Sequence, residues 1–307
     1  MVIRPTTTSP RPAILFLQGL SCDSLDPPSG PAVHVLPLIE TIARSGFVTV
    51  RIDKSGVGRS SGPSCEDLDF ASEVAGFRSA LQALRTWPVV DSSRVFLLGW
   101  SLGGVIAPLL ANDQVAGVVA YGTDALPWLD YDVSNAKRQW RMHGIPADRI
   151  EGWALRFAAF DRELLAGSDE PMQVVGRHPE FASWLDDQHH LQGRHLAYFR
   201  QLASLDQEAA WRGVKSNVLI VAGEADFTCA AQDQQAVARI VNSVAPGKAR
   251  SVRIPCADHW FRHTCSMQES MADETSGQFE PAIAQVIVRW LLAQTADSGS
   301  VNTTDAQ

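Results

Sequence analysis

Short apolar runs alternate with longer stretches of helical spacing along most of the chain. Short runs between turn-forming residues are typical of buried strands, and apolar residues three and four positions apart are typical of helices. The predicted strands cover residues 13–17, 48–53, 95–98, 117–121, 217–222 and 250–254. The predicted helices cover residues 33–45, 68–86, 102–111, 233–244 and 281–293. This order predicts an α/β fold, with a mostly parallel central sheet that helices cover on both faces.

The alternation breaks once, between Tyr121 and Asn217. This stretch has no strand pattern, but several of its segments have helical spacing. A structureless loop of this length is implausible inside a compact domain, so we expect an inserted all-helical unit. The small, polar residues at the C-terminal end predict a disordered tail. The expected units are a core over residues 1–127 and 212–294, an insertion over 128–211, and a tail over 295–307.

The composition indicates a soluble globular protein and excludes several classes of function. The 307 residues are 45% hydrophobic and 20% charged, as expected for a chain with a full hydrophobic core. A formal net charge of -8 argues against nucleic acid binding, which needs a basic surface. No apolar run has the length of a membrane span, and the first residues lack a signal pattern. We therefore expect a cytoplasmic protein, or a secreted one if a signal was removed before residue 1.

The five cysteines are too few and too scattered for a disulfide scaffold, and no C-x-x-C pair suggests zinc. The simplest expectation is free thiols in a reducing compartment. One or two disulfides are the alternative, because four cysteines each follow a predicted strand within a loop: Cys22, Cys65, Cys229 and Cys256.

The sequence VFLLGWSLGG, residues 95–104, leads from a predicted strand into a predicted helix and places Ser101 at the turn. A nucleophilic hydroxyl must stand clear of the backbone, and a tight turn achieves this only when its neighbours are small. Gly99 and Gly103 meet that requirement. The helix that follows brings its positive end to the site, so the Leu102 N–H is expected to donate to an oxyanion.

A serine nucleophile needs a general base and a carboxylate that orients this base. Asp226 follows the predicted strand over 217–222, and His259 follows the one over 250–254. Because parallel strands end at the same edge of a sheet, we expect both residues to meet Ser101 in one crevice.

In this order the motifs resemble those of the α/β-hydrolase superfamily, over about residues 12–293. The matching segments are GWSLGG, the GEAD ending at Asp226, the DHW around His259, and DKSGVGRS, residues 53–60, which is similar to the family loop D-x-x-G-x-G-x-S. The resemblance implies a catalytic triad of Ser101, Asp226 and His259. The fuller family sheet has two further strands before the first one predicted here, so we expect either a trimmed member or a piece of a longer parent.

The resemblance also implies a second oxyanion donor in the loop after the first predicted strand. Many relatives have H-G-x here, and this chain has Gln18, Gly19 and Leu20. By that match the Leu20 N–H is the donor. Gln18 in place of histidine would change how the loop is supported, unless it only caps the strand end.

Other residues compete for the triad roles. His263 lies four residues after His259, in predicted helical surroundings that favour a surface or packing role. Asp124 also follows a strand and is a second candidate for the acid, whereas Glu224 is expected to be a capping or surface carboxylate. We favour His259 and Asp226.

The insertion lies where the family carries its lid. The tryptophans of this region are expected to form the lid core, with one or two of them facing the substrate: Trp128, Trp140, Trp153, Trp184 and Trp211. The residues expected to line the substrate pocket are Gln18, Trp100, Trp128 and Trp260.

The remaining polar motifs favour structural roles. The glycines at 56 and 58 lack the fuller phosphate-loop pattern, and Lys54 is expected to be solvated or paired. His189, His190 and His195 are interpreted as a solvated helical segment and not as metal ligands. We expect no metal and no organic cofactor.

Together the motifs predict a serine hydrolase that cleaves a carboxylic ester or thioester of a small-molecule acyl substrate through an acyl-enzyme. The alternatives are a peptidase or amidase, an acyltransferase or thioesterase, and a non-catalytic binding protein. The dehalogenase and epoxide-hydrolase branch is disfavoured, because its members resemble this fold with an aspartate at the turn. The oligomeric state stays open.

Overall fold

The structure of this chain is a computed structural model that describes residues 2–3, 9–25, 33–111, 115–273 and 276–296. Within this part of the chain, one seven-stranded sheet has the order β1-β3-β2-β4-β5-β6-β7. Its strands are β1 (Val2–Ile3), β2 (Arg11–Leu17), β3 (Val48–Arg51), β4 (Val90–Trp100), β5 (Gly117–Tyr121), β6 (Asn217–Gly223) and β7 (Ala249–Ile254). All neighbours pair in parallel except β1, which is antiparallel to β3. The mostly parallel sheet is confirmed, and β1 is a strand that the sequence pattern did not predict.

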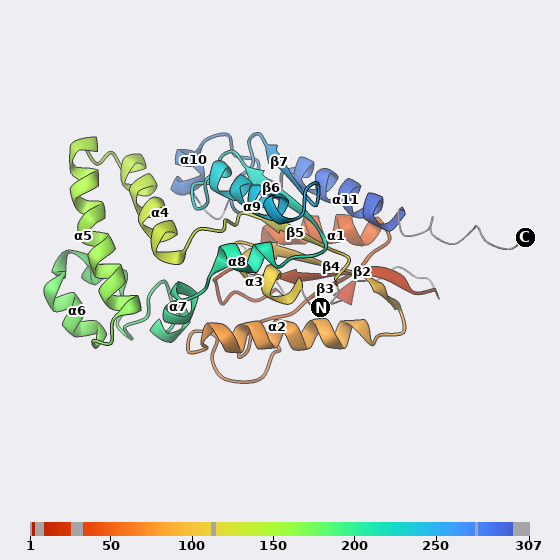
Figure 1. The fold of residues 1–307 in the computed structure, drawn as a ribbon, viewed down its shortest axis with the longest axis horizontal. Helices are drawn as coiled ribbons and strands as arrows, with labels where there is room; N and C mark the ends of the chain where they lie inside the picture. The colour runs from red at the N-terminus through yellow and green to blue at the C-terminus, as the bar shows by residue number, and fades with distance from the viewer. Residues whose placement is uncertain (1, 4–8, 26–32, 112–114, 274–275, 297–307) are drawn as a thin grey trace, which may run out of the picture.

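The sheet is buried on both faces, because different helices cover them (Figure 1). One face packs against α1 (Val35–Arg44) and α11 (Pro281–Ala296). The other packs against α2 (Phe70–Arg85), α3 (Leu102–Ala111) and α9 (Ala231–Val244). Helices on both faces of a parallel sheet are what the alternating pattern predicted.

The side chains of β2 contribute to the hydrophobic cores on both faces of the sheet. Ala13, Leu15 and Leu17 point into one core, and Ile14 and Phe16 point into the other. All five are fully buried. Since successive residues of a strand face opposite sides, a strand buried on both faces is apolar throughout.

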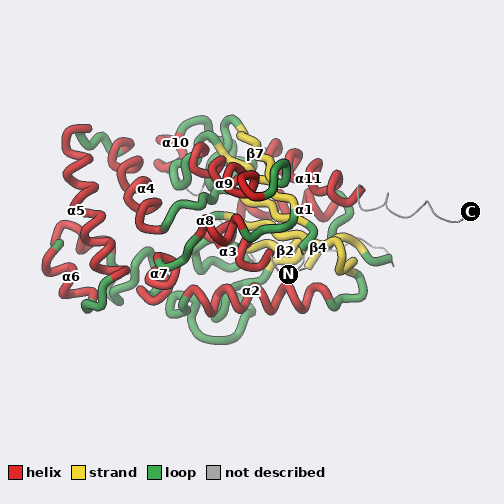
Figure 2. Tube along the Cα trace, in the orientation of Figure 1, coloured by secondary structure: helices red, strands yellow, loops and turns green. Residues whose placement is uncertain are grey.

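The chain between β5 and β6 forms a helical insertion that extends from one end of the sheet (Figures 1 and 2). Its helices pack through aromatic side chains, such as Trp140 and Trp184 against Phe157 and Trp153 against Trp140. The elements are α4 (Trp128–Met142), α5 (Ala147–Ala166), α6 (Pro171–Arg177), a 3-10 helix (Pro179–Trp184), α7 (Leu196–Ala203) and α8 (Gln207–Arg212).

The end of the chain differs from its prediction. α11 continues to Ala296, so the first two residues of the expected disordered tail are helical. The rest of that tail, 297–307, lies outside the described residues. A short helix, α10 (Met267–Ala272), also follows the predicted position of the general base and was not predicted.

Four of the five cysteines form disulfides, so the expectation of free thiols is wrong for them and the alternative of one or two disulfides is confirmed. Cys22 pairs with Cys65, and Cys256 pairs with Cys265. Cys229 is a buried free thiol. Disulfides persist mainly in oxidising environments.

In the ranges that the structure describes, no helix combines the length and apolar character of a membrane span.

Candidate active site

The turn between β4 and α3 presents Ser101 in an unusual backbone conformation. Its φ angle is 55°, in the left-handed region that side chains other than glycine rarely adopt. The Ser101 N–H donates to the Tyr121 carbonyl at 2.9 Å, and its own carbonyl accepts from the Gly104 N–H at 2.8 Å. These bonds hold a strained residue at the edge of a pocket, the arrangement that an exposed nucleophile requires.

Glycines next to Ser101 allow the strand and the helix to approach closely. A Cβ atom added to Gly99 would lie 2.5 Å from the Gly103 carbonyl oxygen, and one added to Gly103 would lie 2.0 Å from the Leu17 carbonyl oxygen. Both distances are too short for any side chain. The small residues of the motif are therefore required by backbone packing.

The Asp226 carboxylate orients the His259 ring. Its Oδ2 lies 3.0 Å from His259 Nδ1. Oδ2 also accepts a hydrogen bond from Gln234 Nε2 at 3.1 Å, and Oδ1 accepts one from the Cys229 N–H at 2.7 Å. Asp226 is fully buried, so these donors compensate the desolvation of its charge.

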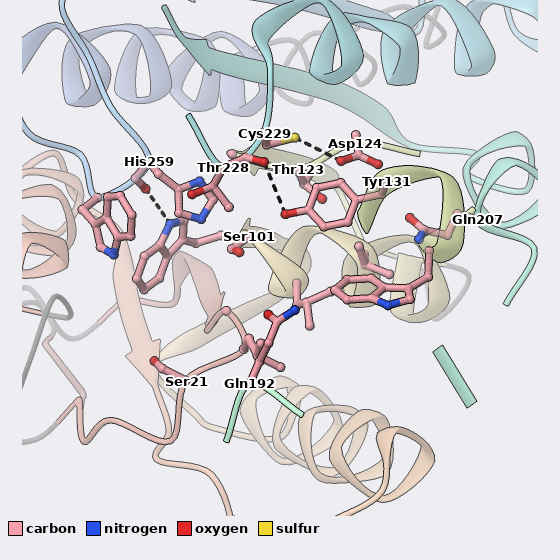
Figure 3. Close-up of a pocket in the computed structure, with 18 of the residues that line it drawn as sticks. Ser21, Ser101, Thr123, Asp124, Tyr131, Gln192, Gln207, Thr228, Cys229 and His259 are labelled. Carbon is pink, nitrogen blue, oxygen red and sulfur yellow. Dashed lines mark hydrogen bonds between the residues drawn. The ribbon is translucent and has the colours of Figure 1, made fainter. Parts of the chain in front are cut away.

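A cavity of about 370 Å³ opens in front of this histidine and is lined by both Ser101 and His259 (Figure 3). Trp100, Trp128 and Trp260, three residues expected in the pocket, line it as well. The Trp100 indole N–H donates to the His259 carbonyl at 2.8 Å and so steadies the loop that carries the ring. The structure thus brings Ser101, Asp226 and His259 to one end of the sheet, with Asp226 behind the ring.

Leu20 and Leu102 also line the cavity beside Ser101. Gly19 lies against Ser101, since a Cβ added to it would be 2.9 Å from Ser101 Cβ. In the described residues neither the Leu20 N–H nor the Leu102 N–H has a hydrogen-bond acceptor. Two free donors near the Ser101 hydroxyl can stabilise an oxyanion.

Gln18 does not line the pocket, contrary to the sequence prediction. Its side chain is fully buried, and its Nε2 donates to the Asp23 carbonyl at 2.9 Å. Gln18 therefore joins the two ends of the loop that contains Leu20 through a buried hydrogen bond.

Of the rival residues, Asp124 also lines the cavity, whereas His263 and Glu224 lie outside its lining. Asp124 accepts hydrogen bonds from the Leu126 N–H at 2.9 Å and from Cys229 Sγ at 3.1 Å, and burial raises its pKa to about 6. His263 is exposed and pairs with Glu280, as expected for a surface histidine, but no helix surrounds it. Glu224 is a surface carboxylate paired with Arg253 at 3.1 Å.

Several pocket residues were missed by the sequence reasoning. Tyr131 lies three residues after Trp128 on α4, so helical spacing could have identified it. Its hydroxyl donates to the Thr228 carbonyl at 3.3 Å, which joins the insertion to the loop after β6. Gln192 and Gln207 had no such signal, because only the folded insertion brings them to the pocket.

The histidine segment is a loop and not the solvated helix that we expected. His189 has a φ of 59°, His190 is buried, and His195 caps α7 by accepting from the Ala197 N–H. Among the described residues, the one close group of metal-ligand types is Cys256, His263 and Cys265. Its two sulfurs are joined in a disulfide and are not thiolate ligands.

Comparisons with known proteins agree with this architecture. A sequence model described as the alpha/beta hydrolase family matches residues 19–276. The thiohydrolase apmlB of Arthrinium phaeospermum is 30% identical over 142 residues, which are 45% of this chain and 41% of that protein. The chain thus spans about two fifths of the length of this curated relative.

Two solved structures are similar in fold. Est1E from Butyrivibrio proteoclasticus, with ferulic acid bound, has a TM-score of 0.61 at 18% identity, over 96% of this chain and 94% of that chain. The alpha/beta hydrolase GrgF from Penicillium sp. sh18 has a TM-score of 0.56 at 15% identity, over 96% of this chain and 93% of that chain. At these identities the likeness shows a shared fold alone.

Proposed function

Given that the chain belongs to the alpha/beta hydrolase family, we propose that it is a serine hydrolase that cleaves a carboxylic ester or thioester. One observation carries the proposal. A strained Ser101 and a His259 ring held by Asp226 at 3.0 Å line the same cavity. This is the combination of nucleophile, base and orienting carboxylate that acyl transfer to serine requires.

In the proposed reaction, Ser101 Oγ attacks the acyl carbon while His259 Nε2 accepts the hydroxyl proton. Asp226 stabilises the resulting imidazolium through Nδ1, and the Leu20 and Leu102 N–H groups donate to the oxyanion. The His259 proton then passes to the leaving alcohol or thiol, which leaves an acyl-enzyme. Water, deprotonated by His259, attacks this ester and releases the acid and free Ser101.

The walls of the cavity favour an acyl group with an aromatic or extended apolar part. Trp128 and Tyr131 of α4 and Gln207 of α8 bring the insertion to the pocket, which supports a role for residues 128–211 as a lid. The relative that is named a thiohydrolase supports a thioester as the alternative to an oxygen ester.

The proposal is tested with Ser101→Ala. We expect this variant to lose hydrolysis of p-nitrophenyl acetate and labelling by a fluorophosphonate probe by at least a factor of about 1,000, because no other group supplies the nucleophile. Ser183→Ala, an exposed serine of the insertion, is the matched control and keeps both activities. Unchanged labelling of folded Ser101→Ala would refute the assignment.

A substrate panel separates the competing reactions. Preference for p-nitroanilides would indicate an amidase, and acyl products formed with added alcohols or amines would indicate an acyltransferase. A folded wild-type protein that hydrolyses no ester, thioester or anilide and is not labelled would indicate a binding protein.

A further inference from the structure

A buried cluster of charged side chains lies directly behind the loop that contains Leu20. Lys54 follows β3, Glu73 is on α2, and Arg194 precedes α7 in the insertion. Lys54 Nζ lies 3.2 Å from Glu73 Oε1, and Arg194 Nη2 lies 2.8 Å from Glu73 Oε2. The three side chains are 1–2% exposed, so Lys54 is paired and buried and not solvated. Burying two cations with one carboxylate is costly unless further acceptors are present.

These further acceptors are the backbone carbonyls of the oxyanion loop. Lys54 Nζ donates to the Gly19 carbonyl at 2.5 Å and to the Leu20 carbonyl at 3.1 Å. Arg194 Nη1 donates to the same Leu20 carbonyl at 3.0 Å. Both carbonyls that flank the Leu20 Cα are thus held by cations.

The position of Lys54 has a consequence for the Leu20 N–H. The Gly19 carbonyl and the Leu20 N–H belong to one planar peptide group, and in a trans peptide they point in opposite directions. A cation on the carbonyl therefore directs the N–H to the other side, where Gly19 lies against Ser101. It also withdraws electrons from this peptide, which makes the N–H a stronger donor.

We propose that Lys54 is a positioning residue that orients and polarises the Gly19–Leu20 peptide of the oxyanion hole, with Glu73 and Arg194 holding its ammonium in place. The inference depends on the proposed function, because it assigns Lys54 to the transition state of the Ser101 reaction. It predicts an effect on kcat more than on KM, since the oxyanion exists only after the attack.

The charges around Lys54 set the pH at which this support is lost. Burial lowers the pKa of Lys54 to about 8, and the nearby Arg194 lowers it too, whereas Glu73 and Asp23 raise it. Tyr198 completes the surroundings by donating to Glu73 Oε1 at 3.1 Å. Lys54 is charged below its pKa and neutral above it, so kcat falls as pH rises through about 8.

The first test measures the pH dependence of p-nitrophenyl acetate hydrolysis, corrected for spontaneous hydrolysis, in wild type and Lys54→Met. We expect Lys54→Met to lower kcat at pH 7 about tenfold, less than the loss of a whole oxyanion donor, with KM within about twofold. The alkaline fall in kcat disappears in this variant. Lys137→Met, which removes a lysine paired with Glu151 at 2.7 Å on the surface, is the matched control and leaves kcat unchanged.

A second variant keeps Lys54 and changes only its surroundings. Glu73→Gln removes the partner that raises the Lys54 pKa, so the fall in kcat moves to lower pH. In the control variant Lys137→Met, the pH midpoint of this fall stays at its wild-type value. This test applies even if Lys54→Met does not fold. Lys54→Met with wild-type kcat, or Glu73→Gln with an unshifted profile, would overturn the proposal.

The two proposals fail in different ways. If Ser101→Ala abolishes hydrolysis and folded Lys54→Met does not change it, the serine mechanism stands and the role of Lys54 is refuted. If Ser101→Ala remains active, the serine mechanism itself is wrong.

Discussion

Single glycines decide how closely the backbone packs around Ser101. At Gly99 a methyl group would collide with the Gly103 carbonyl at 2.5 Å, whereas at Gly76 on α2 nothing lies within 4 Å of the added atom. The same substitution therefore has opposite physical consequences at the two positions.

We expect Gly99→Ala to lower the free energy of unfolding by about 1–3 kcal/mol and to reduce activity, because α3 must shift away from β4. Gly76→Ala is expected to raise the free energy of unfolding by up to about 1 kcal/mol, since alanine is the better helix former. Urea unfolding of both variants checks the pair. Equal effects at the two positions would contradict this account.

At the residue scale, the tight turn at Ser101 could be predicted from the sequence because its steric requirements are local. Ser101, Gly99 and Gly103 lie within five positions, and backbone sterics explain the two glycines. The prediction that Gln18 lines the pocket was wrong because its amide donates to the Asp23 carbonyl. The direction of this amide depends on the shape of the loop between the two residues, which the sequence does not reveal. Gln192 and Gln207 reach the pocket only through the tertiary packing of the insertion, which no local pattern reports.

At the scale of elements, α4 and α5 share an unusual feature. Asp132 on α4 and Asp161 on α5 are both buried, and in the described residues the Oδ2 atom of each has no hydrogen-bond partner. Burial raises the pKa of Asp132 to about 7, and burial together with Asp132 raises the pKa of Asp161 to about 8. Each pKa lies above the ordinary value of 3.8, so the folded state binds more protons than the unfolded state between these limits.

The contribution of this pair to stability is therefore fully present below about pH 3.8 and is lost as pH rises through about 7 to 8. Asp132→Asn removes one of these charges, so we expect a flatter Tm profile between pH 5 and pH 9 and a free energy of unfolding higher by at least about 1 kcal/mol at pH 8. Asp187→Asn, in an exposed loop, is the control. A parallel decrease in Tm for wild type and Asp132→Asn would contradict the assignment.

Helices and strands were predicted correctly where the residues of the element itself show an apolar or periodic pattern. Five of the six predicted strands have buried apolar runs that reveal them. β7 is an edge strand with exposed Arg250 and Arg253, and only its Ile254 is buried. β1 has only two residues, which is too short for any periodicity, and it is defined by its pairing with β3. The Cys256–Cys265 bond was also missed, because no local pattern shows that the chain after β7 brings these two cysteines together.

At the scale of the whole molecule, the two disulfides close loops of very different length. Cys22 and Cys65 are 43 residues apart, and Cys256 and Cys265 are 9 apart. Closing a loop restricts the unfolded chain more when the loop is long, by about 4 kcal/mol for the first and about 3 kcal/mol for the second.

We expect Cys22→Ala with Cys65→Ala to lower the free energy of unfolding more than Cys256→Ala with Cys265→Ala. Urea unfolding of both double variants, with thiol counts by mass spectrometry, provides the measurement. Three alkylatable cysteines in unfolded wild-type protein without reductant would contradict the two-disulfide structure.

The insertion leaves the sheet after β5 and returns at β6, and these strands are adjacent and parallel. Any two such strands need a long crossover connection, and here that connection has grown into five α-helices in the described chain. Replacing it with another helical segment would leave every hydrogen bond of the β5–β6 ladder in register. The part of the pocket wall that comes from α4 and α8 is therefore a module that could be exchanged by grafting if the graft keeps Arg194, whereas Ser101 and His259 belong to loops that the sheet itself anchors.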